Sequence, residues 1–249
     1  MGGRSYKTEA VVLRSFRLGE ADRVLHVYTL DRGRVGAVAK GVRKTTSRFG
    51  ARLEPLSHAE LLLHQGSGEL HTVTGVQLVR AHSAAREDYY RLSVGLIAAE
   101  AMLRLFSEQE RNERAFTALT RFLDLLDEAP HAADRPALDP LGLSFQLKLL
   151  WLSGYLPHLT SCAECAADDV ALVGYSPRAG GAVCASCAGK TEALALGPDG
   201  VAGIETLLAH PLADAAPLGL SERARRDALR VVTASYEYHG GFRLRTLSA

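Results

Sequence analysis

The sequence has no uncharged apolar run of about 18 residues, which is the length that a bilayer-spanning helix needs. Its first residues, Met-Gly-Gly-Arg-Ser-Tyr-Lys, also lack the apolar segment of a secretory signal. We therefore expect a cytoplasmic protein with no membrane partner. In that reducing compartment, clustered cysteines favour a metal site over disulfide bonds.

The common catalytic and nucleotide-binding motifs are missing as well. The chain has no Walker A motif, no His-Glu-x-x-His, no Gly-x-Ser-x-Gly and no Gly-x-Gly-x-x-Gly after a strand. The histidines of the N-terminal part are scattered, and they form no acid–base pair with a recognisable spacing. We therefore predict that the protein is not an enzyme and has no small-molecule substrate.

Acidic residues are scarce at the front of the chain. Residues 1–80 contain 13 Lys and Arg against 7 Asp and Glu, whereas residues 81–249 contain 16 against 21. A basic front part and an acidic back part indicate two domains with different partners. Since 47% of the 249 residues are hydrophobic, the chain can supply each domain with a core.

The first 80 residues show the pattern of β structure. Short runs with strand character occupy residues 8–14, 21–30, 35–39, 58–65 and 69–79. Asp31-Arg32-Gly33 and Gly66-Ser67-Gly68 are turn signals between them. Five short strands in this length predict a small barrel of OB type, and an SH3-like barrel fits the pattern nearly as well.

From about residue 82 the hydrophobic period becomes helical. Phe116, Leu119, Leu123 and Leu126, for example, recur at spacings of three and four. Residues 129–140 contain three prolines and read as a loop between helices. A short helix is expected between Pro198 and Pro211. A last helix is expected from the N-cap Ser221 to about His239, where two glycines end it.

All four cysteines fall into two Cys-x-x-Cys pairs, Cys162 with Cys165 and Cys184 with Cys187. The two-residue spacer lets both thiolates of a pair reach one ion, and the 18 residues between the pairs allow a hairpin. This spacing predicts a structural zinc site with four thiolates in a segment at 160–190. Two disulfides or a redox Cys-x-x-Cys are weaker alternatives. Four thiolates leave no open position for His158 or for water, which disfavours a zinc hydrolase.

These patterns together predict an α+β chain of two domains. A five-stranded OB-fold barrel that binds nucleic acid occupies residues 1–80. A helical domain occupies residues 81–249 and contains the inserted zinc-binding segment.

The stretch from Arg32 to Leu53 contains seven Lys or Arg and no Asp or Glu. Such a stretch on a small barrel suits phosphate contacts that do not read sequence. Phe16, Tyr28 and Phe49 would offer surfaces for base stacking, although single aromatics more often belong to the core. The alternative is a solvated loop whose charges bind nothing.

A second basic group lies on the last predicted helix. It fits a solvated helix face as well as a contact with nucleic acid or a partner. Its members are Arg223, Arg225, Arg226 and Arg230.

Several segments resemble the RecO family of bacterial recombination mediators. The specific part is GRVGAVAKGVRK at 33–44, followed by SRF at 47–49 and LEPL at 53–56. AVVLR at 10–14, LGEADR at 18–23, GYLP at 154–157 and the ending Tyr236-x-x-His239 with Leu244-Arg245-x-x-Ser248 resemble the family too. The resemblance covers nearly the whole chain, with the helical middle matching only loosely.

The resemblance implies a protein of recombinational DNA repair that binds single- and double-stranded DNA and anneals complementary strands without ATP. It implies action with RecR in loading RecA onto strands coated by SSB, and a contact between the helical domain and the acidic C-terminal tail of SSB. It places the protein in the cytoplasm, at the nucleoid. By the family pattern, the DNA-facing residues are Arg14, Arg34, Lys40, Arg43, Lys44, Arg48 and Arg52.

The alternative hypothesis is a protein-interaction scaffold of a repair complex, for which nucleic-acid affinity is incidental. Binding of plain oligonucleotides across a range of salt concentrations separates the two hypotheses. The sequence leaves open the oligomeric state, the stoichiometry with RecR and the groove that takes the SSB tail.

Overall fold

The computed structural model describes residues 4–43, 47, 49–128, 130 and 133–247. By packing, the chain divides into two compact units, residues 1–128 and residues 129–249, and each is described separately. The composition predicts a boundary at residue 80 instead, between a nucleic-acid-binding domain and a helical domain, and that boundary stays a prediction.

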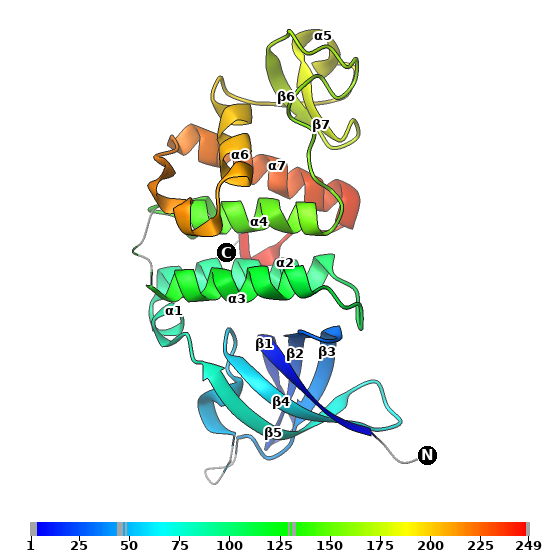
Figure 1. Ribbon diagram of the computed structural model, residues 1–249, viewed down its shortest axis with the longest axis vertical. Coiled ribbons are helices and arrows are strands. Elements are labelled where there is room, and N and C mark those ends of the chain that lie inside the picture. Colours follow the sequence, from blue (N-terminus) through cyan, green and yellow to red (C-terminus); the bar gives the residue numbers. More distant parts are fainter. Residues whose placement is uncertain (1–3, 44–46, 48, 129, 131–132, 248–249) are drawn as a thin grey trace. The chain divides into compact units, whose positions relative to one another are not determined.

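The first unit begins with a closed five-stranded barrel (Figure 1). Its strands are β1 (Arg4–Leu18), β2 (Asp22–Thr29), β3 (Gly33–Ala39), β4 (His58–Gln65) and β5 (His71–Arg80). The order around the barrel is β1-β2-β3-β5-β4, with β4 pairing back to β1 and only the β3–β5 pair parallel. This order is that of the OB fold, so the OB-type prediction is confirmed and the SH3-like alternative is excluded.

The barrel core follows from the alternation of side chains along the strands. Leu25 and Val27 from β2 and Val35 and Ala37 from β3 point inward and are almost completely buried. Past β3 the chain enters a short 3-10 helix, η1 (Gly50–Leu53), and its Leu53 also joins this core. The far end of the basic stretch is therefore packed against the barrel.

Three helices complete the first unit: α1 (Ser83–Glu87), α2 (Tyr89–Leu105) and α3 (Glu113–Glu128). The buried imidazole of His82 joins them to the barrel, since Nδ1 lies 2.8 Å from the Leu56 carbonyl and Nε2 lies 3.0 Å from the Asp124 carboxylate. Gly95 on α2 allows close approach, because a Cβ there would lie 2.5 Å from Leu56 Cδ1. The helices and the barrel thus share buried contacts.

The second unit is built on α4 (Pro140–Leu152), α6 (Gly200–Ala209) and α7 (Glu222–Gly240). Asp139 caps α4 by accepting from the Gly142 amide, and Ser221 caps α7 by accepting from the Ala224 amide. The last helix ends at Gly241 in the left-handed conformation, so both of its predicted ends are confirmed. The short 3-10 helices are η2 (Pro136–Leu138), η3 (Leu212–Asp214), η4 (Ala216–Leu218) and η5 (Arg245–Leu247).

Between α4 and α6 the chain forms a small three-stranded sheet with the cysteines at one end. Its strands are β6 (Leu172–Ser176), β7 (Gly181–Cys184) and β8 (Leu194–Ala195), and the single turn α5 (Ala185–Ala188) follows β7. Tyr175 on β6 is buried, and its hydroxyl lies 2.7 Å from Ser235 Oγ on α7. This contact ties the inserted sheet to the helices of the same unit.

None of the helices in the described part of the chain combines the length and the apolar composition that a bilayer crossing requires.

Candidate nucleic-acid interface and metal centre

The basic stretch after β3 is held against the turn between β1 and β2. The Gly41 amide donates to Asp22 Oδ1 at 2.7 Å, and the Arg43 amide donates to the Ala21 carbonyl at 3.0 Å. On the other side, Val42 is buried and Phe49 is partly buried against the barrel core. Val42 and Phe49 therefore anchor the described part of this stretch against the barrel.

Most of the described residues of the predicted DNA-facing set are exposed. Arg14 on β1, together with Lys40, Arg43 and Arg52, faces solvent, and the Arg43 guanidinium also donates to the Glu20 carbonyl. Arg34 differs, because it is half-buried, donates to the Leu103 carbonyl and lies 3.4 Å from Glu108. Lys44 and Arg48 lie outside the described residues, so their placement remains a prediction.

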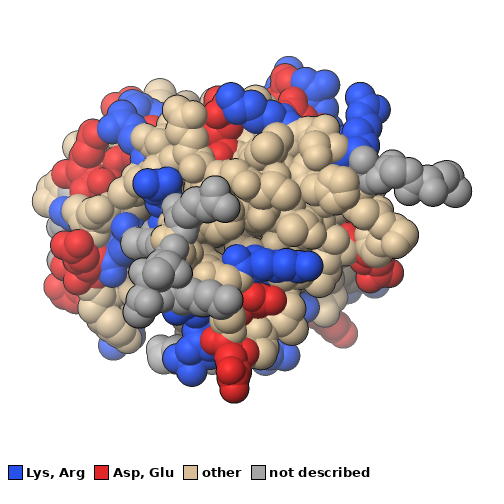
Figure 2. Space-filling model, turned by 90° about the horizontal axis from the view of Figure 1, so that it is seen from below, with Lys and Arg blue, Asp and Glu red and all other residues tan. Residues whose placement is uncertain are grey.

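Figure 2 shows one face of the barrel with its charged side chains coloured. Lys and Arg side chains surround a broad uncharged area, and Asp and Glu side chains lie between some of them. In the part of this face that the structure describes, the cations do not form one continuous stripe. The described part of this face therefore presents separate cations around an area without charged side chains.

The three aromatic residues considered for base stacking have different environments. Tyr28 is completely buried and packs edge-on against Phe106, so it presents no face to a base. Phe49 packs against the core. Phe16 is 41% exposed, its ring lies 5.6 Å from that of His26, and the guanidinium carbon of Arg14 lies 5.8 Å from its centroid.

His26 is the residue of this group that the sequence analysis missed. It pairs with Arg14 across β1 and β2. The sequence contains part of the evidence for His26, because alternation along 21–30 places Val24, His26 and Tyr28 on one face of the strand. What was missing was the pairing register with β1.

The arginines of the last helix are largely engaged within the second unit. Arg226 forms an ion pair with Glu222 one turn earlier, and Arg230 pairs with Asp227 and donates to the Ala195 carbonyl. Both side chains of the Arg226–Glu222 pair are more than half-exposed, so this pair contributes little to stability. Asp227, in contrast, is buried and also accepts from the Gly197 amide.

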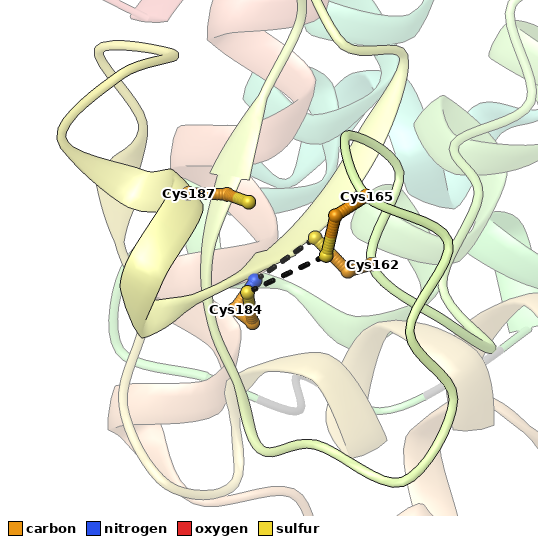
Figure 3. A group of neighbouring side chains, drawn as sticks. All are labelled: Cys162, Cys165, Cys184 and Cys187. Atoms are coloured by element: carbon orange, nitrogen blue, oxygen red, sulfur yellow. Dashed lines mark hydrogen bonds between the residues drawn. The ribbon is translucent and has the colours of Figure 1, made fainter.

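The four cysteines converge on one point, as Figure 3 shows. Their sulfur atoms all lie within 4.8 Å of one another, and Cys165 Sγ is 3.9 Å from Cys184 Sγ. None of them forms a disulfide. Around a tetrahedral ion with bonds of about 2.3 Å, sulfur atoms lie roughly 3.8 Å apart. The donor set and its spacing therefore fit a metal with four thiolate ligands.

The protein around the cysteines shifts the pKa values of two of the thiols in opposite directions. The backbone amide of Cys184 donates to Cys162 Sγ at 3.4 Å, and this hydrogen bond is the main cause that lowers the pKa of Cys162 to about 6. Burial among the other thiols raises the pKa of Cys187 to about 12. A bound cation would reverse that second effect, because a coordinating thiol loses its proton.

Backbone packing brings the two cysteine pairs together. The His158 amide donates to the Gly180 carbonyl, and the Ala182 amide donates to the His158 carbonyl at 2.7 Å. Gly181 is needed there, since a Cβ would lie 2.2 Å from the His158 carbonyl oxygen. The imidazole of His158 is not among the clustered ligand atoms, and its Nε2 lies 2.7 Å from Ser161 Oγ.

Comparison with known proteins points to one family over nearly the whole chain. Residues 1–82 match the family model described as "Recombination protein O N terminal", and residues 86–248 match "Recombination protein O C terminal". The DNA repair protein RecO of Rubrobacter xylanophilus is 39% identical over 235 residues, covering 93% of this chain and 90% of that protein. The DNA repair protein RecO of a Nocardioides species is 37% identical over 238 residues, covering 94% of each. That of Anaeromyxobacter sp. strain K is 36% identical over 241 residues, covering 96% and 92%.

Proposed function

This chain belongs to the RecO family of DNA repair proteins, and on that premise we propose that it binds single- and double-stranded DNA and anneals complementary strands without ATP. The family consists of recombination mediators rather than enzymes. The protein would act in the cytoplasm, at the nucleoid, where its DNA substrate lies.

The barrel supports this proposal through its exposed cations. Arg14, Lys40, Arg43 and Arg52 face solvent on an OB-type barrel, and contacts of this kind hold phosphates without reading bases. Annealing requires that the charge of two strands be neutralised while the bases stay free to pair. Lys44 and Arg48 belong to the proposed set by sequence, and Arg34 belongs to it with its guanidinium partly engaged by Glu108.

The experiment that tests DNA binding compares charge reversals at matched sites. We expect Lys40→Glu with Lys44→Glu to weaken binding to oligonucleotides of any sequence. The slope of log K against log salt should flatten by roughly 0.9 for each lost contact with duplex DNA. Lys7→Glu is the control, because Lys7 is an exposed barrel lysine outside the set. Unchanged affinity in the double variant would favour the scaffold alternative.

The proposal extends to partners: with RecR, the protein would help load RecA onto strands coated by SSB. We propose that the SSB C-terminal tail binds the second unit, where a cavity of about 620 Å³ has apolar walls that include Trp151, Leu156 and Leu208. Annealing of SSB-coated strands tests this contact. The reaction should slow when the SSB carries no tail, and equal rates with both forms would argue against it.

For the cysteines we propose a structural zinc ion held by Cys162, Cys165, Cys184 and Cys187. The observation that supports this zinc proposal is the cluster of four thiols, whose spacing is close to that of a tetrahedral site. When bound, zinc would cross-link the inserted sheet. We do not expect this zinc ion to take part in catalysis, because four thiolates leave no coordination position for water.

A further inference from the structure

The register of the first hairpin places an unusual group of side chains on the outside of the barrel. A bulge at Leu13 shifts β1, so that Val12 pairs with Val27 whereas Arg14 pairs with His26. Beyond the bulge, Arg14 and Phe16 therefore share a face with His26 and Val24. This is the outer face, because Leu25 and Val27 fill the core.

The group forms a row across three strands. Phe16 and His26 lie 5.6 Å apart with their ring planes inclined by 32°. On β3, Gly36 pairs with His26 and has no side chain, and Leu70 lies over it, since a Cβ at Gly36 would be 2.7 Å from Leu70 Cδ2. Phe16 and Leu70 are 41% and 43% exposed. The row is therefore an open aromatic and apolar surface.

Positive charge borders this surface. Arg14 lies beside the Phe16 ring, and both Arg14 and Arg34 are near His26. Burial is the main cause that lowers the pKa of His26, and the two guanidinium groups lower it further, against an opposing effect of Glu108. Near neutral pH the imidazole is thus uncharged and contributes a ring face without repelling Arg14.

We propose that Phe16 and His26 form a stacking surface for unpaired bases of a single DNA strand, with Arg14 holding an adjacent phosphate. A single exposed phenylalanine would need no explanation. Here an exposed ring, a neutral second ring and a guanidinium occupy one face of an OB-type barrel, and this combination is how such folds hold single strands. In a duplex the base faces are covered, so the surface distinguishes single from double strands.

This inference rests on the proposed DNA binding and deepens it, so the test must separate the two. Anisotropy titrations would use three labelled probes of equal length: oligo(dT), an abasic strand with the same phosphates, and a duplex. Wild-type protein should bind oligo(dT) more tightly than the abasic strand. Phe16→Leu should weaken oligo(dT) binding by roughly 5- to 100-fold. Binding to the abasic strand and the duplex should stay within about twofold.

Matched variants separate stacking from loss of structure. Phe16→Tyr keeps the ring and should bind like wild type, whereas His26→Gln should weaken oligo(dT) binding alone. Leu78→Ala removes an exposed apolar side chain on β5, 39% exposed, and should leave all three affinities unchanged. The inference is overturned if Phe16→Leu leaves oligo(dT) binding unchanged or weakens all probes equally. If wild-type protein binds none of the probes, the proposed function itself fails.

Discussion

Gly33 and Gly19 occupy similar turns of the barrel in very different surroundings. Both have a positive φ, of 61° and 58°. A Cβ at Gly33 would lie 1.9 Å from the Glu110 carbonyl oxygen, whereas a Cβ at Gly19 would meet nothing within 4 Å. The backbone of residues 108–110 runs beside Gly33, where the Gln109 amide donates to the Arg34 carbonyl. Gly33 thus permits close packing as well as a turn.

We therefore predict unequal losses of stability from the same substitution. Gly19→Ala should lower the free energy of unfolding by about 1–2 kcal/mol, the cost of the left-handed conformation for alanine. Gly33→Ala should lower the free energy of unfolding by about 1–3 kcal/mol more than Gly19→Ala does, because residues 108–110 must move. Urea denaturation of both variants measures the difference. Equal losses would mean that the contact with residues 108–110 contributes nothing to stability.

For single residues, the sequence predicts the exposure of charged side chains better than the surroundings of aromatic side chains. The exposure of Lys40 and Arg43 follows from charge alone, but nothing in the sequence distinguishes Phe16 from Tyr28. Tyr28 is buried because Phe106, far along the chain, packs on it, and Phe16 is exposed on the same outer face of the barrel. The decisive contacts are non-local, so neither alternation nor composition reports them.

Among the elements, the inserted sheet has the least core of its own. Its strands have five, four and two residues, and its buried apolar cluster consists largely of Val183 and three of the cysteines. So small a segment requires a cross-link to remain folded. The contact between Tyr175 and Ser235 connects it to α7 but does not hold the two cysteine pairs together.

Removal of the proposed zinc ion should therefore loosen this element alone. We predict that a chelator, or Cys162→Ser, makes residues 160–190 sensitive to protease while the barrel remains protected, because metal binding supplies folding free energy to the sheet. The measured zinc content should be one ion per chain in the untreated protein and lower after the chelator or in Cys162→Ser. His158→Ala is the control and should retain the zinc, since its ring is outside the cluster. Identical digestion of zinc-bound and stripped protein would contradict the prediction.

Element boundaries were predictable where local chemistry determines them. Strand β4 was placed at its observed limits, His58–Gln65, and α7 was placed within a residue or two by Ser221 and the two glycines. The bulge in β1 was not predicted. The run TEAVVLR at 8–14 became a strand of 15 residues, because the pairing partners of its ends, on β4 and on β2, lie elsewhere in the sequence.

For the whole molecule, composition and packing divide the chain differently. Charge and hydrophobic period suggest a boundary near residue 80, while the compact unit that contains the barrel extends to residue 128. Contacts within that unit explain the difference. His58 packs edge-on against Phe116, Tyr28 against Phe106, and the His82 imidazole bridges the Leu56 carbonyl and Asp124.

The two boundaries predict different behaviour for fragments. We expect residues 1–128 to unfold cooperatively and to bind single-stranded DNA within a few-fold of the full chain, because the barrel and the helices that cover it are both present. A fragment of residues 1–80 would expose Tyr28, Leu56 and His58, which are buried in the structure. It should therefore aggregate or lack a cooperative transition, since small domains have little stability to lose.

Thermal melts followed by circular dichroism, together with anisotropy titrations, compare the two fragments directly. The variant Phe116→Ala in the fragment 1–128 provides an internal check, because it removes one helix contact with the barrel while the chain length stays the same. It should lower the stability of the fragment by about 3–5 kcal/mol, the usual cost of deleting a buried phenylalanine side chain. A fragment 1–80 that melts as cooperatively as 1–128 would instead establish the barrel as an independent domain. The helices α1–α3 would then be dispensable for its fold.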